Sequence, residues 1–447
     1  MAKSRPYRFR FYRANFAKKA KYLFHSVLIF CKRIFLSINA WFNVRWRRIT
    51  VAMSITLVLF IINFLWLQVD FNLTNEDTLI RWESIFKRTT FLDRYTNNHK
   101  LKDSLLLIDF SNAKRLVKRP GIIGDVVETD LQKLKYLVNA IRVQGNSHRY
   151  IICDLLFDAD EDSLISEIKK TERIVTPYVL TDEGKTEGVL EQGVNSGYVG
   201  FPISSGPFSS SLLLKYELFA QGNRKTLPVV MYEELYHTKL KPQQHFFIKG
   251  DDVMMSNSGI LDLRVRPFQL ETTGNNLQVF PIDELLGIIS LNDKESFEPL
   301  FKGKYVLIGD FKNDLHPTVF GDVPGTLILM NMYYALTKHD NRISLDWILF
   351  ELSCLFLTCY LLINANGYFD TGWLAKLTKS RYGGLISLTL ITTLLLWLIS
   401  ISSYFIFDKH LDVIVLVLLL SIGSFIFKLY EIFKEPLVKF CNNLRNH

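Results

Sequence analysis

The chain has 447 residues, a formal net charge of +9 and 49% hydrophobic residues. That length allows two or three domains. Of five cysteines only Cys153 lies between residues 70 and 346, which excludes an intrachain disulfide in that region. This region must therefore be stabilised by a hydrophobic core, in which Cys153 is predicted to be a small buried strand residue.

Residues 1–48 are basic and aromatic, and thirteen Lys and Arg but no Asp or Glu precede Asp70. The favoured interpretation is an interfacial helix on anionic lipid headgroups. A plain topogenic signal is the second interpretation, and nucleic-acid binding is a distant third without a supporting motif. The candidate contacts with lipid or a partner in this segment are Trp41, Arg45, Arg47 and Arg48.

Four apolar segments are predicted to be transmembrane helices, at residues 49–69, 347–363, 385–407 and 413–430. The first and third have the roughly 20 residues that a helix needs to cross the hydrocarbon layer. The first lacks a small-residue cleavage site and is interpreted as an uncleaved anchor. The second carries Glu351, which is predicted either to reach the outer headgroups or to pair with a partner subunit.

The distribution of charge predicts which side of the membrane each segment faces. Cytoplasmic ends are enriched in Lys and Arg, as are residues 1–48, the loop at residues 364–384 and the tail at residues 431–447. Residues 70–346 carry 32 Lys and Arg against 38 Asp and Glu. We therefore expect both termini in the cytoplasm and the large domain outside it.

The large domain begins with strands and helices in alternation. Continuous apolar runs predict buried strands at residues 104–110, 150–157 and 173–180, the last with Pro177 at an edge or an end. Amphipathic helices are predicted at residues 129–145 and 160–170. This alternation predicts an α/β domain with a largely parallel sheet and right-handed crossovers.

The remainder of the domain is less regular. A helix is predicted at residues 226–240, and alternating polarity predicts strands at residues 260–268 and 276–282. A further buried strand lies within residues 301–310, and Gly325 precedes a predicted helix at residues 326–338.

Five acidic residues follow the predicted strands and form the candidate ligand-binding set. In parallel α/β sheets ligands lie beyond the carboxyl ends of the strands. Clustered carboxylates can bind a divalent cation, a cationic ligand or a Lys or Arg of a partner, but Asp also serves as a cap and turn former, which is the favoured interpretation. These residues are Asp109, Asp154, Asp158, Asp310 and Asp314.

No sequence motif predicts an enzyme, a cofactor or a metal site. The phosphate-loop, dinucleotide and zinc-protease motifs are missing, and GVNSG at residues 193–197 has Asn195 in place of a nucleophilic Ser. The histidines lack metal-ligand spacing. His316, beside Asp314, is predicted to be a solvated loop residue or a proton-sensitive partner of that carboxylate.

Residues 300–336 resemble the last strand, acidic loop and helix of the CHASE domain of type two, a bacterial extracytoplasmic sensory domain. The resemblance extends over roughly residues 70–430, including the strands LLLIDFS and YIICDLLF and the membrane helices that follow the domain. The matching residues are Gly303-Lys304, Ile308-Gly309, Asp314, His316-Pro317-Thr318 and Pro324-Gly325.

The chain departs from this family in three places. The Thr-Pro pair is reversed at Pro317-Thr318, and RPGIIGDVVETD replaces the family's Trp-Pro-rich stretch. Family members commonly continue into a cytoplasmic kinase, cyclase or phosphatase, for which the residues after Tyr430 leave no room. The resemblance thus implies a sensory domain in a bacterial inner membrane, without its own output domain.

Two hypotheses follow for function. In the first, the chain is a membrane-anchored sensory or recognition module that acts through a separate membrane protein. In the second, it is a structural scaffold subunit of an envelope or membrane complex. The expected partners are membrane lipids and another membrane protein, with a homo-oligomer as an open alternative, but no nucleic acid.

Overall fold

The computed structural model divides into two compact units, Met1–Phe60 with Leu352–Leu388 and Ile61–Glu351 with Thr389–His447, which are described separately. The residues that it describes are 46, 48–65, 79–84, 104–118, 125–143, 146–157, 161–181, 185–189, 193–201, 204–206, 209–243, 246–249, 253–266, 277–290, 294–340, 342–368, 383–407 and 409–422.

A mixed sheet of mostly parallel strands lies at the centre of the second unit, in agreement with the sequence. Its order is β17-β1-β18-β4-β5-β6, with β7 also paired to β5, and β6 is antiparallel to β5. The strands are β1 Leu105–Asp109, β4 Tyr150–Cys153, β5 Ile174–Leu180, β6 Thr186–Gly188, β7 Ser196–Tyr198, β17 Val279–Pro281 and β18 Tyr305–Gly309.

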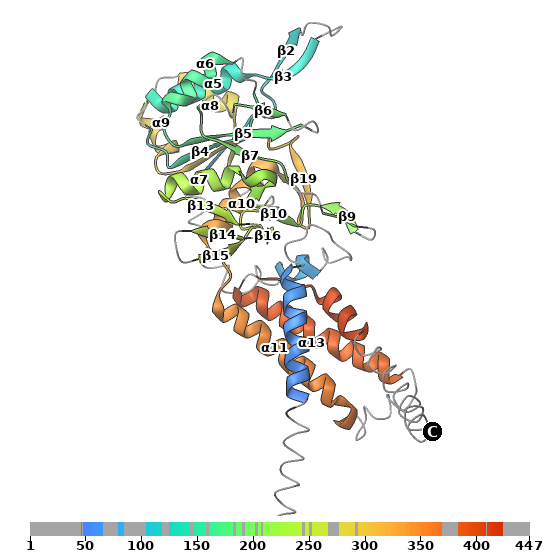
Figure 1. Cartoon of the computed structure of the whole chain (residues 1–447). Coiled ribbons are helices and arrows are strands. Elements are labelled where there is room, and N and C mark those ends of the chain that lie inside the picture. The colour runs from blue at the N-terminus through green and yellow to red at the C-terminus, as the bar shows by residue number, and fades with distance from the viewer. Residues whose placement is uncertain are drawn as a thin grey trace, which may run out of the picture. The chain divides into compact units, whose positions relative to one another are not determined.

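Helices cover both faces of this sheet (Figure 1). Successive strand side chains point to opposite faces, so Leu106 and Ile108 of β1 join one core and Leu105 and Leu107 the other. The first core also contains residues of α5 Leu131–Val143, α6 Asp162–Lys170, α8 Ile282–Ser290 and α9 Lys294–Phe301; the second contains residues of α7 Leu227–Leu235 and α10 Gly325–Thr337.

Buried side chains and a capping contact agree with the two predicted helices, and the predicted burial of Cys153 is confirmed. Leu164, Ile165 and Ile168 of α6 are buried, and so is Cys153. Asp130 caps α5, because its carboxylate accepts a hydrogen bond from the N–H of Gln132 at 3.2 Å.

Other boundaries differ from the sequence prediction. The strand predicted at residues 150–157 ends at Cys153, and of the described residues within 260–268 only Ile260 is in a strand, β16. Residues 276–282 supply only the short β17, since the acidic Asp283 and Glu284 favour a helix start at Ile282. Pro177 lies in β5, which is not an edge strand, but beyond the residues of β5 that pair with β4.

The remaining strands form small antiparallel pairs and a three-stranded sheet, β13-β14-β15. The pairs are β2 Lys114–Lys118 with β3 Asp125–Thr129, β8 Ser204–Gly206 with β9 Ser209–Leu212, β10 Lys215–Glu217 with β16 Ser258–Ile260, β11 Phe219–Ala220 with β12 Arg224–Lys225, and β19 Leu315–Thr318 with β20 Gly321–Pro324; the sheet comprises β13 Leu240–Gln243, β14 Phe246–Lys249 and β15 Val253–Ser256, and η2 is Gln221–Asn223.

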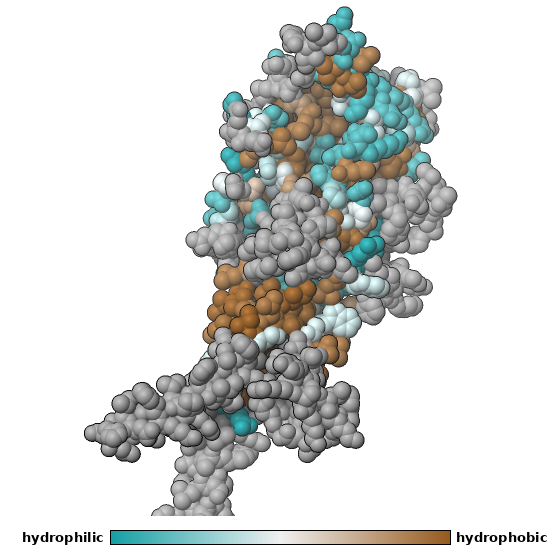
Figure 2. Space-filling model, turned by 90° about the vertical axis from the view of Figure 1, so that its right-hand side faces the viewer, coloured by the Kyte–Doolittle hydropathy of each residue, from teal (hydrophilic) through white to brown (hydrophobic). Residues whose placement is uncertain are grey.

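Among the described residues, three helices are long and apolar enough to cross a membrane: Arg48–Leu65, Leu345–Ile363 within α11 (Leu345–Tyr368), and Leu390–Phe407 within α13 (Gly383–Phe407). Hydrophobic residues gather over this part of the surface in Figure 2. The fourth predicted span is described only as the shorter apolar helix Val413–Ile422, and its residues 423–430 lie outside the described residues.

In the first unit, hydroxyl groups on the membrane helices bond to their own backbone. Ser54 Oγ donates to the carbonyl of Thr50 at 3.0 Å, and Thr358 Oγ1 donates to that of Cys354 at 2.9 Å. Such bonds satisfy a hydroxyl where water is excluded.

Gly309 permits close packing of β18 against the start of α10. A Cβ atom at this position would overlap Thr326 Oγ1 and lie 3.1 Å from Thr326 Cβ. We predict that Gly309→Ala lowers the free energy of unfolding by about 1–3 kcal/mol, and by less in a Thr326→Ala background. Thermal unfolding of the full chain in mild detergent measures the change. Gly287→Ala, with no atom within 4 Å of its added Cβ, is the matched control; an equal loss in both variants contradicts the packing argument.

Candidate functional site at the carboxyl edge of the sheet

Three candidate aspartates lie at one edge of the sheet because β18 is inserted between β1 and β4. Asp109 of β1 is in register with Gly309 of β18, and Ile308 of β18 is in register with Cys153 of β4. Asp310 directly follows β18, and Asp154 directly follows β4. The aspartates nevertheless fall into two groups with different surroundings.

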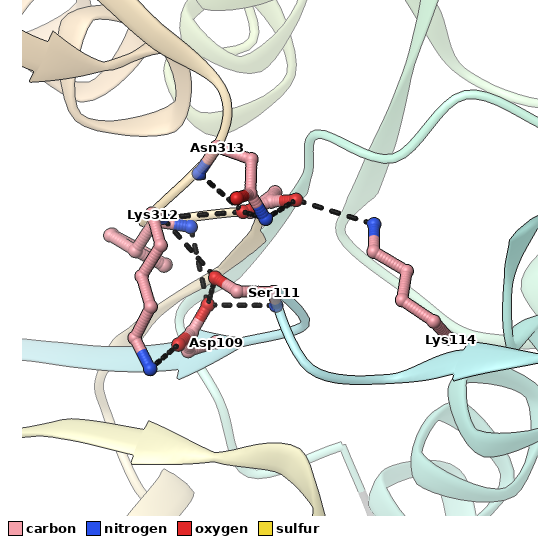
Figure 3. A network of polar contacts seen from close by, with 7 residues as sticks. Asp109, Ser111, Lys114, Lys312 and Asn313 are labelled. Atoms are coloured by element: carbon pink, nitrogen blue, oxygen red, sulfur yellow. Dashed lines mark hydrogen bonds and ion pairs between the residues drawn. The ribbon is translucent and has the colours of Figure 1, made fainter. Parts of the chain in front are cut away.

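Asp109 belongs to the first group and is already satisfied by its own chain (Figure 3). Its Oδ1 accepts hydrogen bonds from the N–H groups of Ser111 at 2.9 Å and Phe311 at 3.2 Å, and from the Ser111 hydroxyl. The Lys312 ammonium lies 3.8 Å from its Oδ2, and the side chain is 5% exposed. Through these contacts Asp109 links the loop after β1 to the loop after β18.

Asp310 in the same group caps the loop that follows β18. It accepts hydrogen bonds from the N–H groups of Asn313 at 2.8 Å and Lys312 at 3.2 Å, and Lys114 Nζ lies 3.3 Å away. Partial burial raises the pKa of Asp310, but hydrogen bonds from Asn313, Ser111 and Lys312 outweigh it and hold that pKa at about 2. The turn-former interpretation therefore describes Asp109 and Asp310.

The second group converges on the space beside Gly325, at the start of α10. A Cβ atom there would overlap Asp314 Oδ2 and lie 3.2 Å from His316 Nε2 and 3.3 Å from Asp154 Oδ2. His316 Nε2 is 3.2 Å from Asp314 Oδ1, and the edge of the Phe201 ring packs against the imidazole. The end of β4 and the start of β19 thus present two carboxylates and an imidazole to one point beside the start of α10.

Asp154 differs from the capped aspartates in its hydrogen bonds. Within the described part of the chain, its carboxylate accepts a hydrogen bond from Thr326 Oγ1 at 3.0 Å and none from a backbone N–H. Burial and then the negative charge of Asp314 raise the pKa of Asp154 to about 7, although Thr326 and His316 act in the opposite direction. A positive charge placed between the carboxylates would relieve both effects.

The second group is open to solvent on one side. The side chain of Asp314 is 44% exposed and that of His316 is 28% exposed. No grouping of His, Cys, Asp or Glu suited to a metal ion occurs among the described residues. The chemistry that this arrangement offers is the recognition of an organic cation, such as an ammonium or guanidinium group, or the exchange of a proton.

The other candidate residues are placed as follows. Arg48 is exposed at the start of the first membrane helix, whereas Asp158, Trp41, Arg45 and Arg47 lie outside the described residues. Glu351 is the remaining candidate contact with lipid or a partner. It is 0% exposed, and its Oε1 accepts a hydrogen bond from Asn63 Nδ2 at 2.8 Å.

The sequence analysis missed a buried polar cluster at Glu83, Ser400 and His410. Glu83 Oε2 lies 2.7 Å from His410 Nδ1, and Ser400 Oγ donates to Glu83 Oε1 at 2.8 Å. Glu83 is more than 300 positions away from Ser400 and His410 in the sequence. The available sequence signal was the polar run His410 and Asp412 between two apolar segments.

No protein-family model matches this chain, and no curated protein or solved structure is significantly similar to it. The resemblance to the CHASE domain of type two therefore stays a prediction.

The raised pKa of Asp154 predicts a pH-dependent stability. The folded-state pKa of about 7 lies above the model-compound value of 3.8, so the folded state binds the additional proton between these values. The stabilising contribution of protonated Asp154 is complete below about pH 4 and is lost as the pH rises through 7. We expect the difference in unfolding free energy between wild type and Asp154→Asn to fall across this window, by at most about 1.4 kcal/mol per pH unit.

Thermal unfolding between pH 2 and pH 8 tests this expectation, with Asp310→Asn as a control of opposite sign. The lowered pKa of Asp310 predicts a contribution that is complete above about pH 4 and is lost as the pH falls through 2. Identical profiles for the two variants would contradict the assignment.

Proposed function

We propose that this chain is a membrane-anchored recognition module that acts through a separate membrane protein. Residues 70–346 form the recognition domain, and the group of Asp154, Asp314 and His316 beside Gly325 is its binding site. The single observation that carries the proposal is the convergence of these three side chains at a partly open edge of a parallel sheet.

The proposed ligand is a cationic group on a small molecule or on a partner protein. Two carboxylates close to one point attract a positive charge, which lowers the cost of ionising both. A guanidinium or ammonium group can donate hydrogen bonds to both carboxylates, and the His316 imidazole places a further ring nitrogen beside them.

The proposed topology has four spans, with the large domain outside the cytoplasm of a bacterial cell. Charge asymmetry supports this orientation. Contacts between helix ends support opposite directions for successive spans. Trp347 Nε1 donates to Ser403 Oγ at 3.1 Å, and the N–H of Asp412 donates to Asn63 Oδ1 at 3.2 Å. The end of the first helix, the start of α11, the end of α13 and the start of the helix Val413–Ile422 therefore lie at one side of the bundle.

A scaffold subunit is the second candidate, favoured by the hairpin of β2 and β3. Leu116 and Val127 are paired across this hairpin and are 68% and 62% exposed. A two-stranded hairpin is only marginally stable alone in water, so an apolar pair on its open face favours a contact with another protein.

Gly325→Ala tests the binding site without removing a polar group. Its Cβ atom displaces Asp314 Oδ2, whereas the Cβ atom of Gly287→Ala meets no atom within 4 Å. We expect the tagged wild type and Gly287→Ala to retain a stoichiometric membrane partner in mild detergent, and Gly325→Ala to lose at least about tenfold of it, which corresponds to about 1.4 kcal/mol. Quantitative mass spectrometry of the purified proteins measures the ratio.

Equal recovery of a signalling partner with all three proteins would contradict the proposed site. Recovery of envelope-assembly proteins in fixed ratio, lost when Leu116 and Val127 are changed to Thr, would instead support the scaffold.

A further inference from the structure

A short helical segment, residues 79–84, contacts both the loops of the α/β domain and the polar cluster beside the membrane helices. All of its contacts described below lie within one compact unit of the chain. Its Ile80, Glu83 and Ser84 are buried. Because these three side chains have different partners, the segment joins several elements at once.

The hairpin of β19 and β20 connects the proposed binding site with this segment. Asp314 precedes β19, His316 lies within it, and Gly325 follows β20; the N–H of Gly325 donates to the carbonyl of Asp314 at 3.0 Å. At the other end of the hairpin, Val319 is packed in a small hydrophobic cluster with Ile80 and Leu214. Two paired strands of four residues extend over about 13 Å, so a shift at one end of the hairpin reaches the other end.

The opposite side of the segment reaches the membrane helices through Glu83. Its carboxylate accepts a hydrogen bond from Ser400 of α13 and is 2.7 Å from His410 in the loop before the last described helix. The side chains of His410 and Glu83 are 3% and 1% exposed. A buried carboxylate without such partners is strongly unfavourable, so this contact fixes residues 79–84 against the loop at residues 409–412.

The cluster continues to the other membrane helices. Ser400 Oγ accepts from the N–H of Leu411 at 3.3 Å, and the N–H of Asp412 donates to Asn63 Oδ1. Asn63 in turn donates to Glu351 of α11. Glu83 thus contacts α13 and the loop before the last described helix directly. The first membrane helix and α11 are connected to that loop through Asn63.

We propose that residues 79–84 are the coupling element through which a change at the site formed by Asp154, Asp314 and His316 alters the membrane helices. The route is the β19–β20 hairpin, the contact of Val319 with Ile80, and the contact of Glu83 with His410 and Ser400. This inference rests on the proposed function, because the change that is transmitted to the membrane helices begins at the proposed binding site. The adjustable part is the loop at residues 409–412, whose backbone is held by side chains rather than by a helix.

Hydrogen–deuterium exchange of the full chain in lipid nanodiscs tests the coupling without any ligand. The reporter is the exchange rate of residues 409–415, where three N–H groups bond to Ser400, Asn63 and Asp412. We expect Gly325→Ala to accelerate this exchange about two- to fivefold, and Gly287→Ala to leave it unchanged. In a Glu83→Gln background, Gly325→Ala is expected to add nothing further.

Glu187→Gln, at an exposed position of β6, controls for the loss of a carboxylate and is expected to behave as wild type. Should Glu83→Gln fail to fold, Ser400→Ala removes one hydroxyl of the cluster and is expected to abolish the response in the same way. Faster exchange at residues 315–324 without any change at residues 409–415 overturns the proposal. Capture of a membrane partner is a separate measurement. If no partner is captured but the exchange rates respond as expected, the proposed recognition function is refuted and the coupling is not.

Discussion

The parallel pairing of β18 between β1 and β4 is the constraint on which the other features of the domain depend. Along the chain β18 is the last strand of the central sheet, and it pairs with both β1 and β4, so loops distant in sequence meet at one edge. The pairing brings the aspartates to that edge and sets α10 against it through Gly309. It also places the β19–β20 hairpin directly after the strand, with its charged residues at the edge and its turn at the contact with Ile80.

Placement at the same edge does not make the acidic residues equivalent. Asp109 and Asp310 accept hydrogen bonds from backbone N–H groups of tight loops, which occupy their carboxylate oxygens. Asp154 faces Thr326 and another carboxylate instead, so its environment disfavours the charge. Two buried glutamates also have partners from other segments. Glu83, beside the membrane helices, accepts a hydrogen bond from Ser400, and Glu351 of α11 accepts one from Asn63.

Local sequence patterns predicted much of this architecture. Continuous apolar runs identified β1, β4, β5 and β18, because strands buried on both faces consist mostly of apolar residues. Long apolar segments identified three helices able to span a membrane. Strand lengths such as that of β4 could not be predicted, because Leu155 and Phe157 are buried without belonging to the sheet. The hydrogen-bond partners of Asp154 and of Glu83 could not be predicted from the sequence either, since both belong to segments more than 150 residues away.

Accessibility of one new cysteine to a membrane-impermeant maleimide is the most direct test of the central claim, a recognition domain outside the cytoplasm. Val127→Cys suits this purpose because Val127 is 62% exposed, whereas Cys153, the native cysteine of that domain, is fully buried. Labelling of Val127→Cys in intact cells, with Cys31 and Cys441 labelled only after permeabilisation, is the predicted result. Labelling of Val127→Cys only after permeabilisation would place the domain in the cytoplasm and contradict the proposed orientation.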